Sequence, residues 1–152
     1  MIAVESTLSP KNSSKASSSL PFVSPISYVD GEPMLDGGIA DSIPLLRARE
    51  LGFDNNLVVL TRNKGYRKSS GAIHLPPFVY GRYPQLREAI HRRNVLYNEQ
   101  LALVEQLEEE GALTVLRPER PIEVGRIERD TRKLAVLYDE GYAAANELDI
   151  KK

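Results

Sequence analysis

Leu35-Asp36-Gly37-Gly38 places an acid and two glycines between an apolar segment and a predicted helix. Open α/β sheets bind ligands at the ends of their strands, so an acid here can present its carboxylate at the mouth of a sheet. The two glycines would let the backbone turn sharply and would leave room for a partner side chain. Asp36 is therefore either a turn residue that caps backbone N–H groups or a general base.

The sequence around this stretch alternates between predicted strands and predicted helices, separated by Gly and Pro signals. Strands are expected at 21–29, 34–36, 57–61 and 112–116, and helices at about 42–51, 84–110 and 130–145. Ser42 is predicted to cap the first helix. Gly52 is expected to end the first helix in the left-handed conformation, and Gly111 is expected to end the second.

This order of elements predicts an α/β fold with a small hairpin, a mostly parallel sheet covered by helices, and a helical C-terminal tail. The long helix carries an apolar stripe at helical spacing, formed by Leu86, Ile90, Tyr97, Leu101, Val104 and Leu107. Arg93 falls within this stripe, where its guanidinium either reaches past the stripe to solvent or is paired.

Residues 1–19 differ from the remainder because they contain seven serines and no large apolar residue after Leu8. Such a segment buries little surface, so we expect it to be mobile at least through Lys15. The expected organisation is a disordered or divergent segment at 1–15, followed by one globular part at 16–152.

Composition excludes several classes of protein. The net charge of −1 gives no general attraction to nucleic acid, and the absence of cysteine excludes disulfides and thiolate chemistry. No apolar run approaches the roughly 18 residues that span a bilayer. We therefore expect a cytoplasmic protein without a transmembrane segment, either free in solution or held peripherally at the membrane.

Other acids and histidines offer weaker candidate sites. Asp30 precedes a glycine too, but it lies at an expected hairpin tip, and Asp41 is expected to favour the start of the following helix. The spacing of Asp36 and Asp41 matches no calcium loop. His74 and His91 lack the spacing of a zinc helix, so we expect no metal site and no cofactor.

A basic loop follows the strand predicted at 57–61. The run from Arg62 to Lys68 holds four cations, namely Arg62, Lys64, Arg67 and Lys68, and no acid. It is either a solvated loop or a contact for an anionic headgroup or phosphate. The Glu108-Glu109-Glu110 run is expected to be the solvated end of a helix.

The sequence contains no nucleophile elbow. That motif is Gly-x-Ser-x-Gly, and no serine in this chain has glycines two residues before and two residues after it. There is also no multi-glycine loop of the kind that forms an oxyanion hole. If Asp36 is a base, this chain does not supply its serine.

Several ordered pieces resemble the C-terminal half of bacterial patatin-like phospholipases. They are Ala16-Ser17-Ser18-Ser19-Leu20-Pro21-Phe22, Leu35-Asp36-Gly37-Gly38-Ile39 with Pro44, and Leu60-Thr61-Arg62 with Gly65-Tyr66-Arg67-Lys68. Tyr83-Pro84, Tyr97-Asn98 and Arg117-Pro118 are similar to the helical tail of that family. The likeness covers about residues 15–146.

The resemblance implies part of a three-layer α/β/α fold and a lipid acyl hydrolase with a Ser-Asp dyad. In that family the aspartate of the Asp-Gly-Gly motif is the base, which gives this role to Asp36, with Gly37 and Gly38 as support. The serine elbow and glycine-rich loop of the family lie in an N-terminal half that this sequence lacks. We therefore expect the isolated chain to be an inactive fragment, split protein or truncated frame.

The resemblance also implies a lipid or fatty-acyl ester as substrate. A sheet that lacks its neighbours would expose apolar edges, so we expect association with a complementary N-terminal half or with a second copy. Two alternatives stay open: a non-catalytic interaction module that binds a partner through the open edge, and an anion-binding domain that uses residues 62–68.

Overall fold

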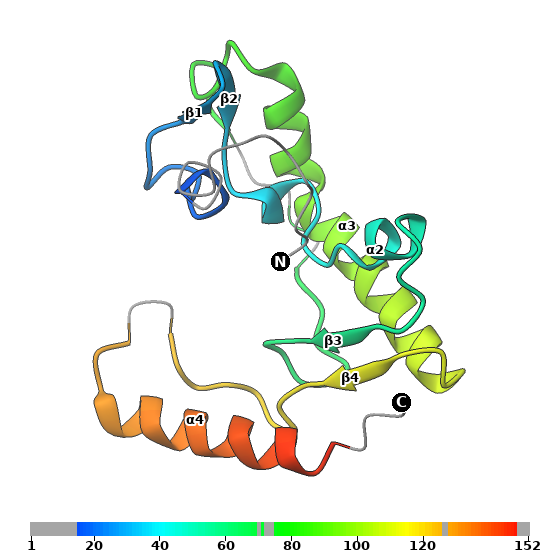
Figure 1. The fold of residues 1–152 in the computed structure, drawn as a ribbon. Helices are drawn as coiled ribbons and strands as arrows, with labels where there is room; N and C mark the ends of the chain where they lie inside the picture. Colours follow the sequence, from blue (N-terminus) through cyan, green and yellow to red (C-terminus); the bar gives the residue numbers. More distant parts are fainter. Residues whose placement is uncertain (1–14, 70, 72–74, 126–127, 149–152) are drawn as a thin grey trace. The chain divides into compact units, whose positions relative to one another are not determined.

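The computed structural model describes residues 15–69, 71, 75–125 and 128–148, and shows a mixed α/β protein (Figure 1). The elements in chain order are β1 (Ser27–Val29), β2 (Glu32–Met34), the 3-10 helix η1 (Gly37–Ile39), α2 (Leu45–Glu50), β3 (Leu57–Val59), α3 (Pro84–Glu109), β4 (Thr114–Leu116) and α4 (Thr131–Asn146). None of these helices is long and apolar enough to cross a bilayer.

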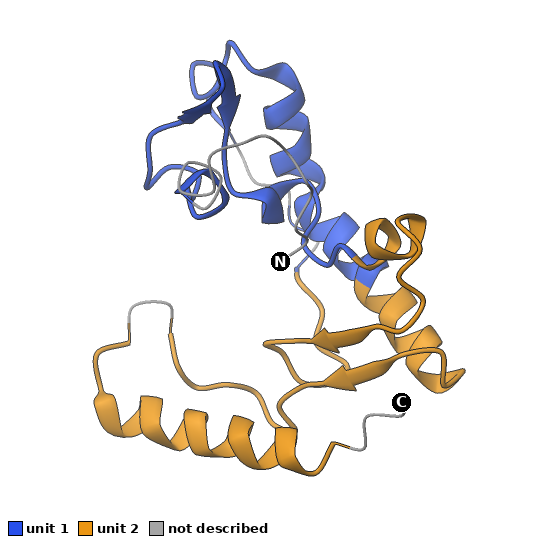
Figure 2. Cartoon of the chain, in the orientation of Figure 1, with its two compact units in different colours: residues 1–44, 69–100 blue, residues 45–68, 101–152 orange. Residues whose placement is uncertain are grey.

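The chain divides into two compact units, which are coloured separately in Figure 2. Unit 1 comprises residues 1–44 and 69–100, and unit 2 comprises residues 45–68 and 101–152. Helix α3 contributes its first part, through Gln100, to unit 1 and the rest to unit 2.

Unit 1 contains a hairpin where one was predicted, but its return strand is Glu32–Met34 and not 34–36. Strands β1 and β2 pair antiparallel, with Val29 opposite Glu32. Asp30 and Gly31 both have positive φ, at 52° and 86°, which is the conformation that a tight two-residue hairpin turn requires. The strand predicted at 21–29 is wrong in its first half, because residues 20–24 form a turn closed by a 2.9 Å hydrogen bond from the Ser24 N–H to the Leu20 carbonyl.

The core of unit 1 joins the Asp36 turn to helix α3. Ile39, Leu75 and Ile90 are buried together, and partly buried apolar side chains pack around them, namely Leu35, Val79, Tyr80, Leu86 and Ala89. Ile39 belongs to η1 and Ile90 to α3, so burial of the predicted apolar stripe fixes the turn that carries Asp36 against the long helix.

Unit 2 contains the predicted parallel pairing. Strand β3 pairs with β4 with Val58 opposite Val115, so the two strands that were expected to be parallel neighbours are confirmed. The rest of the α3 stripe, Leu101, Val104 and Leu107, is buried here. The helix ends before Gly111, as predicted, and the φ of 69° at Gly111 is left-handed.

The two remaining helices agree with the sequence in position. Helix α2 is followed by Gly52 with φ of 86°, as predicted. Asp130 caps α4, since its side chain accepts a hydrogen bond from the Arg132 N–H. Helix α4 buries none of its described side chains, although Leu134, Tyr138 and Tyr142 form the apolar side that the sequence predicts.

Candidate functional site

Asp36 lies between β2 and η1, with its side chain half-buried. Its backbone N–H donates to the Ser19 carbonyl at 2.9 Å, and its Oδ1 accepts from the Gly38 N–H at 2.8 Å. The carboxylate therefore caps the 3-10 helix, as the turn interpretation predicts. Among the described residues this is its one hydrogen bond, so the second oxygen, Oδ2, keeps its acceptor capacity.

The two glycines of the motif have different roles. The backbone turns here as the 3-10 helix η1, and neither glycine needs a positive φ to do so. A Cβ on Gly38 would lie 3.2 Å from Asp36 Oδ1, whereas a Cβ on Gly37 would meet nothing within 4 Å. Gly38 is needed for space beside the carboxylate, and Gly37 is not.

The carbonyl of Gly38 ties the turn to helix α3. Arg93 Nε donates to it at 3.1 Å, and Ser42 Oγ donates to it at 2.7 Å. Arg93 is therefore paired, which was one of the two possibilities for an arginine in the apolar stripe. The helix cap predicted for Ser42 is wrong, because its hydroxyl points back to η1 and α2 starts at Leu45.

Gln100 makes a second connection between α3 and this segment. Its Nε2 donates to Asp41 Oδ1 at 2.6 Å, and its Oε1 accepts from the Ile43 N–H at 3.0 Å. Asp41 was expected to favour the start of the following helix, but α2 starts at Leu45 and the Asp41 carboxylate contacts Gln100 instead. Sequence reasoning missed Gln100, since nothing in its local pattern distinguishes it from a solvated glutamine.

The other candidates of unit 1 show no site. Asp30 lies exposed at the hairpin tip, and His91 is exposed on α3. His74 lies outside the described residues. Within the ranges that the structure describes, no group of His, Cys, Asp or Glu side chains is arranged to hold a metal ion.

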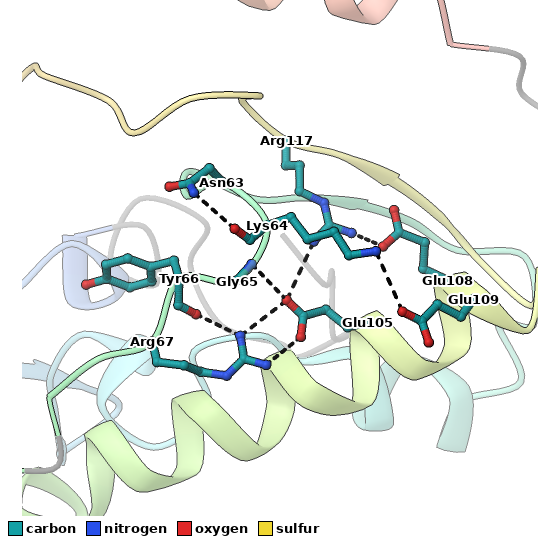
Figure 3. Close-up of polar contacts among 9 residues, drawn as sticks. All are labelled: Asn63, Lys64, Gly65, Tyr66, Arg67, Glu105, Glu108, Glu109 and Arg117. Atoms are coloured by element: carbon teal, nitrogen blue, oxygen red, sulfur yellow. Dashed lines mark hydrogen bonds and ion pairs between the residues drawn. The ribbon is translucent and has the colours of Figure 1, made fainter.

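In unit 2, the basic loop is bound to acids of α3 (Figure 3). Arg67 forms a bidentate pair with Glu105, at 3.2 Å to Oε1 and 2.5 Å to Oε2, and the Gly65 N–H donates to the same Oε1 at 3.4 Å. Lys64 Nζ lies 3.6 Å from Glu109 Oε1. The Arg62 guanidinium stacks on the Tyr66 ring at 4.9 Å from its centroid.

Arg117, directly after β4, completes this network. Its side chain is only 10% exposed, and its guanidinium contacts Glu108 and lies 3.9 Å from Glu105 Oε1. Burial lowers the pKa of Arg117, and the charge of Glu105 acts in the opposite direction. The hydrogen bond from Arg67 lowers the pKa of Glu105 from its ordinary value, which keeps this carboxylate ionised.

This network agrees with one expectation about charge and changes another. Glu109 and Glu110 are exposed at the end of α3, as expected, and Glu108 and Glu109 each have a cationic partner as well. Of the loop cations, Arg67 and Lys64 are paired with carboxylates, so the loop offers less positive charge to an external anion than its sequence indicates. Lys68 also has an interaction partner.

Comparison with known protein families finds a match in the C-terminal part of the chain. Residues 83–148 match a family described as a domain of unknown function (DUF6363). This range contains α3, β4 and α4, and it covers less than half of the chain. No curated protein and no solved structure matches the chain.

Proposed function

We propose that this chain carries the general base of a lipid acyl hydrolase with a Ser-Asp dyad, and that the base is Asp36. The proposal includes the finer fold: residues 16–152 would be the C-terminal part of a three-layer α/β/α patatin-like domain. The serine would come from a polypeptide segment outside residues 1–152, since this sequence contains no Gly-x-Ser-x-Gly. The ordered resemblance to patatin-like phospholipases supports both parts.

The observation that carries the proposal is the state of the Asp36 carboxylate. Oδ1 is held by the Gly38 N–H, and the backbone is held by the Ser19 carbonyl, so the side chain is fixed without a cationic partner among the described residues. A base must be fixed and must keep a free lone pair for the proton that it takes. Oδ2, which accepts no hydrogen bond from the described residues, meets this requirement.

In the proposed reaction, an Asp36 oxygen accepts the serine proton as the serine oxygen bonds to the ester carbonyl carbon. When the tetrahedral intermediate collapses, the ester C–O bond breaks and the departing alcohol takes that proton. Water then attacks the acyl-enzyme and gives a proton to Asp36. The proton returns to the serine oxygen as the fatty acid leaves.

Reconstitution tests the proposal. The full chain is mixed with the N-terminal half of a patatin-like enzyme that contains Gly-x-Ser-x-Gly, and hydrolysis of a short-chain p-nitrophenyl ester is followed. We expect activity only in the mixture, and we expect Asp36→Asn to abolish it. Activity that is equal with Asp36→Asn would refute the base assignment. An inactive mixture, with the two halves shown to associate, would also count against it.

A non-catalytic interaction module is the second candidate, and a specific observation in unit 2 favours it. Strand β3 exposes Leu57 and Val59, and its sheet has only two strands within the described residues, whereas parallel sheets are normally covered on both faces. A groove of about 410 Å³ in the same unit has apolar lining from Val59, Leu116 and Leu137. Binding of the N-terminal half that is unaffected by Asp36→Asn, with no activity, would support this candidate.

Anion binding by residues 62–68 is the weakest of the three candidates, because it competes with the pairing of Arg67 to Glu105. Titration with inorganic phosphate, followed by NMR shifts of the Gly65 and Arg67 amides, tests it directly. Shifts that saturate and disappear in Arg62→Ala would favour it over the network described above. We expect no saturable shift.

A further inference from the structure

We propose that unit 1 inserts two adjoining loops into the interfacial region of a phospholipid bilayer. The loops are residues 20–24 and 76–83, and the exposed side chains Leu20, Phe22, Val23, Phe78 and Arg82 are named here the aromatic surface. This inference rests on the proposed function, because it says how a lipid substrate would meet the part of the chain that carries Asp36.

The first observation is the exposure of apolar side chains on these loops. Phe22 is 60% exposed, Val23 79% and Phe78 85%. Exposed apolar residues are common singly, but a group of them on adjacent loops marks a surface that is covered in function. Pro21 and Pro77 each precede one of the two phenylalanines and restrict the backbone that presents it.

The second observation is that the two loops are held together in a strained conformation. Phe22 has φ of 67° and Tyr80 has φ of 54°, which is a rare conformation for bulky side chains. These two residues contact each other, since the Phe22 N–H donates to Tyr80 Oη at 3.0 Å and their ring centroids are 5.7 Å apart. The strain is therefore located where the two loops meet.

The third observation is that the second loop is held by several hydrogen bonds. Arg87, in α3, donates to the carbonyls of Pro76 at 2.8 Å and Leu75 at 3.1 Å, and also to that of Val79. A further hydrogen bond joins the Tyr83 N–H to the Tyr80 carbonyl at 2.8 Å. Loops fixed in this way lose little conformational entropy on binding, which favours insertion of their side chains.

Charge and chemistry select a bilayer as the occupant. The two loops contain no acid and one cation, Arg82, which is exposed. Apolar tips with a nearby tyrosine hydroxyl and a single arginine match the layered chemistry of a bilayer interface, where acyl chains lie beneath phosphate groups. A strongly basic surface is absent from these loops, so neutral phosphatidylcholine should suffice as the lipid.

The second loop shares a hydrophobic core with the Asp36 turn. Leu75, Val79 and Tyr80 pack in the same core as Leu35 and Ile39, which flank Asp36. The Ser19 carbonyl, which accepts the Asp36 N–H, lies one residue before the first loop. Loops anchored to a lipid surface would therefore hold the proposed base close to that surface.

A single introduced tryptophan tests the inference, because the chain contains none. The Phe78→Trp variant is mixed with phosphatidylcholine vesicles, and its tryptophan fluorescence emission is recorded. The control is Phe53→Trp, because Phe53 lies in unit 2 and is 59% exposed. We expect a shift to shorter wavelength and quenching by dibrominated phosphatidylcholine for Phe78→Trp, and neither for Phe53→Trp. Equal behaviour of the two variants, or no response of Phe78→Trp, would overturn the inference.

Vesicle sedimentation of the chain without tryptophan gives an independent measurement. We expect Phe22→Ser with Phe78→Ser to lower vesicle partitioning at least about tenfold, as for the loss of one fully inserted apolar side chain. The Asp36→Asn variant should bind vesicles as strongly as the parent chain does. Vesicle binding therefore tests this inference, and ester hydrolysis separately tests the base assignment. If the same double variant instead abolishes self-association while vesicles bind neither chain, the surface belongs to a second copy and the inference is wrong.

Discussion

The Nε atom of Arg93, in helix α3, donates a hydrogen bond to the Gly38 carbonyl at 3.1 Å. This contact joins α3, the longest of the described helices, to the turn that carries the proposed base. Arg93 lies in the apolar stripe of α3, and under the proposed assignment of Asp36 it is a positioning residue, because its guanidinium contacts the turn through the Gly38 carbonyl.

Loss of the hydrogen bond from Arg93 should lower the rate of the reaction and leave its mechanism unchanged. We expect Arg93→Met to lower kcat of the reconstituted enzyme by roughly tenfold, since displacement of a catalytic group is costly even when the group is retained. The pH profile should keep its shape, and Arg93→Lys should recover part of the loss. An altered acidic limb in Arg93→Met would instead indicate a direct effect on the base.

The two glycines of the motif provide a matched pair of substitutions. Gly38→Ala places a Cβ where Asp36 Oδ1 lies 3.2 Å away, so the carboxylate must move, and we expect activity to fall about 10²-fold. Gly37→Ala meets nothing within 4 Å and should keep nearly full activity. Kinetics of both variants in the same reconstituted mixture measure the difference. A larger loss for Gly37→Ala would contradict the geometry of the turn.

The ion-pair network of unit 2 should contribute to stability mainly through Glu105. Glu105→Gln removes the charge that faces both Arg67 and the largely buried Arg117, and we expect a loss of about 3 kcal/mol in the free energy of unfolding. The control is Glu109→Gln, whose partner Lys64 is exposed, and it should cost no more than ~1 kcal/mol. Urea denaturation measures both, and equal losses would show that burial of Arg117 has no effect.

The pKa of Glu105 gives this contribution a pH dependence of known sign. The hydrogen bond from Arg67 lowers the pKa of Glu105 from its ordinary value of 4.5, so the folded chain binds this proton less readily than the unfolded chain. The stabilisation is complete above that value and is lost as the pH falls through the lower, folded-state pKa. Denaturation between pH 7 and pH 3 should therefore show the parent chain converging on Glu105→Gln, and a constant difference would contradict this.

The order of the helices and strands could be predicted, because it depends on local sequence signals. Pro84 and Gly111 delimit the longest helix, and the alternation of apolar runs with helices predicts that the strands at 57–61 and 112–116 pair in parallel, which they do over Leu57–Val59 and Thr114–Leu116. The hairpin turn at Asp30-Gly31 follows from the preference of that dipeptide for positive φ. These elements require no knowledge of distant contacts.

The errors arise where distant contacts override local preference. Phe22 belongs to a segment of β-forming residues, yet its contact with Tyr80, 58 residues away, holds it in the left-handed region. Arg67 and Glu105 are 38 residues apart, and no local pattern pairs them. For Asp36, the sequence predicted either a capping role or a catalytic role. The structure shows the capping role, which uses Oδ1 and leaves Oδ2 without a hydrogen bond from the described residues.

The rate of serine acylation measures the central claim most directly. In the reconstituted mixture, the pre-steady-state burst of p-nitrophenol reports the step in which Asp36 would take the serine proton. Asp36→Asn keeps an oxygen that accepts from the Gly38 N–H, so the turn should persist while the burst rate falls about 10²–10⁴-fold. Asp30→Asn, at the exposed hairpin tip, should leave the rate unchanged. A burst rate in Asp36→Asn equal to that of the parent chain would contradict the claim.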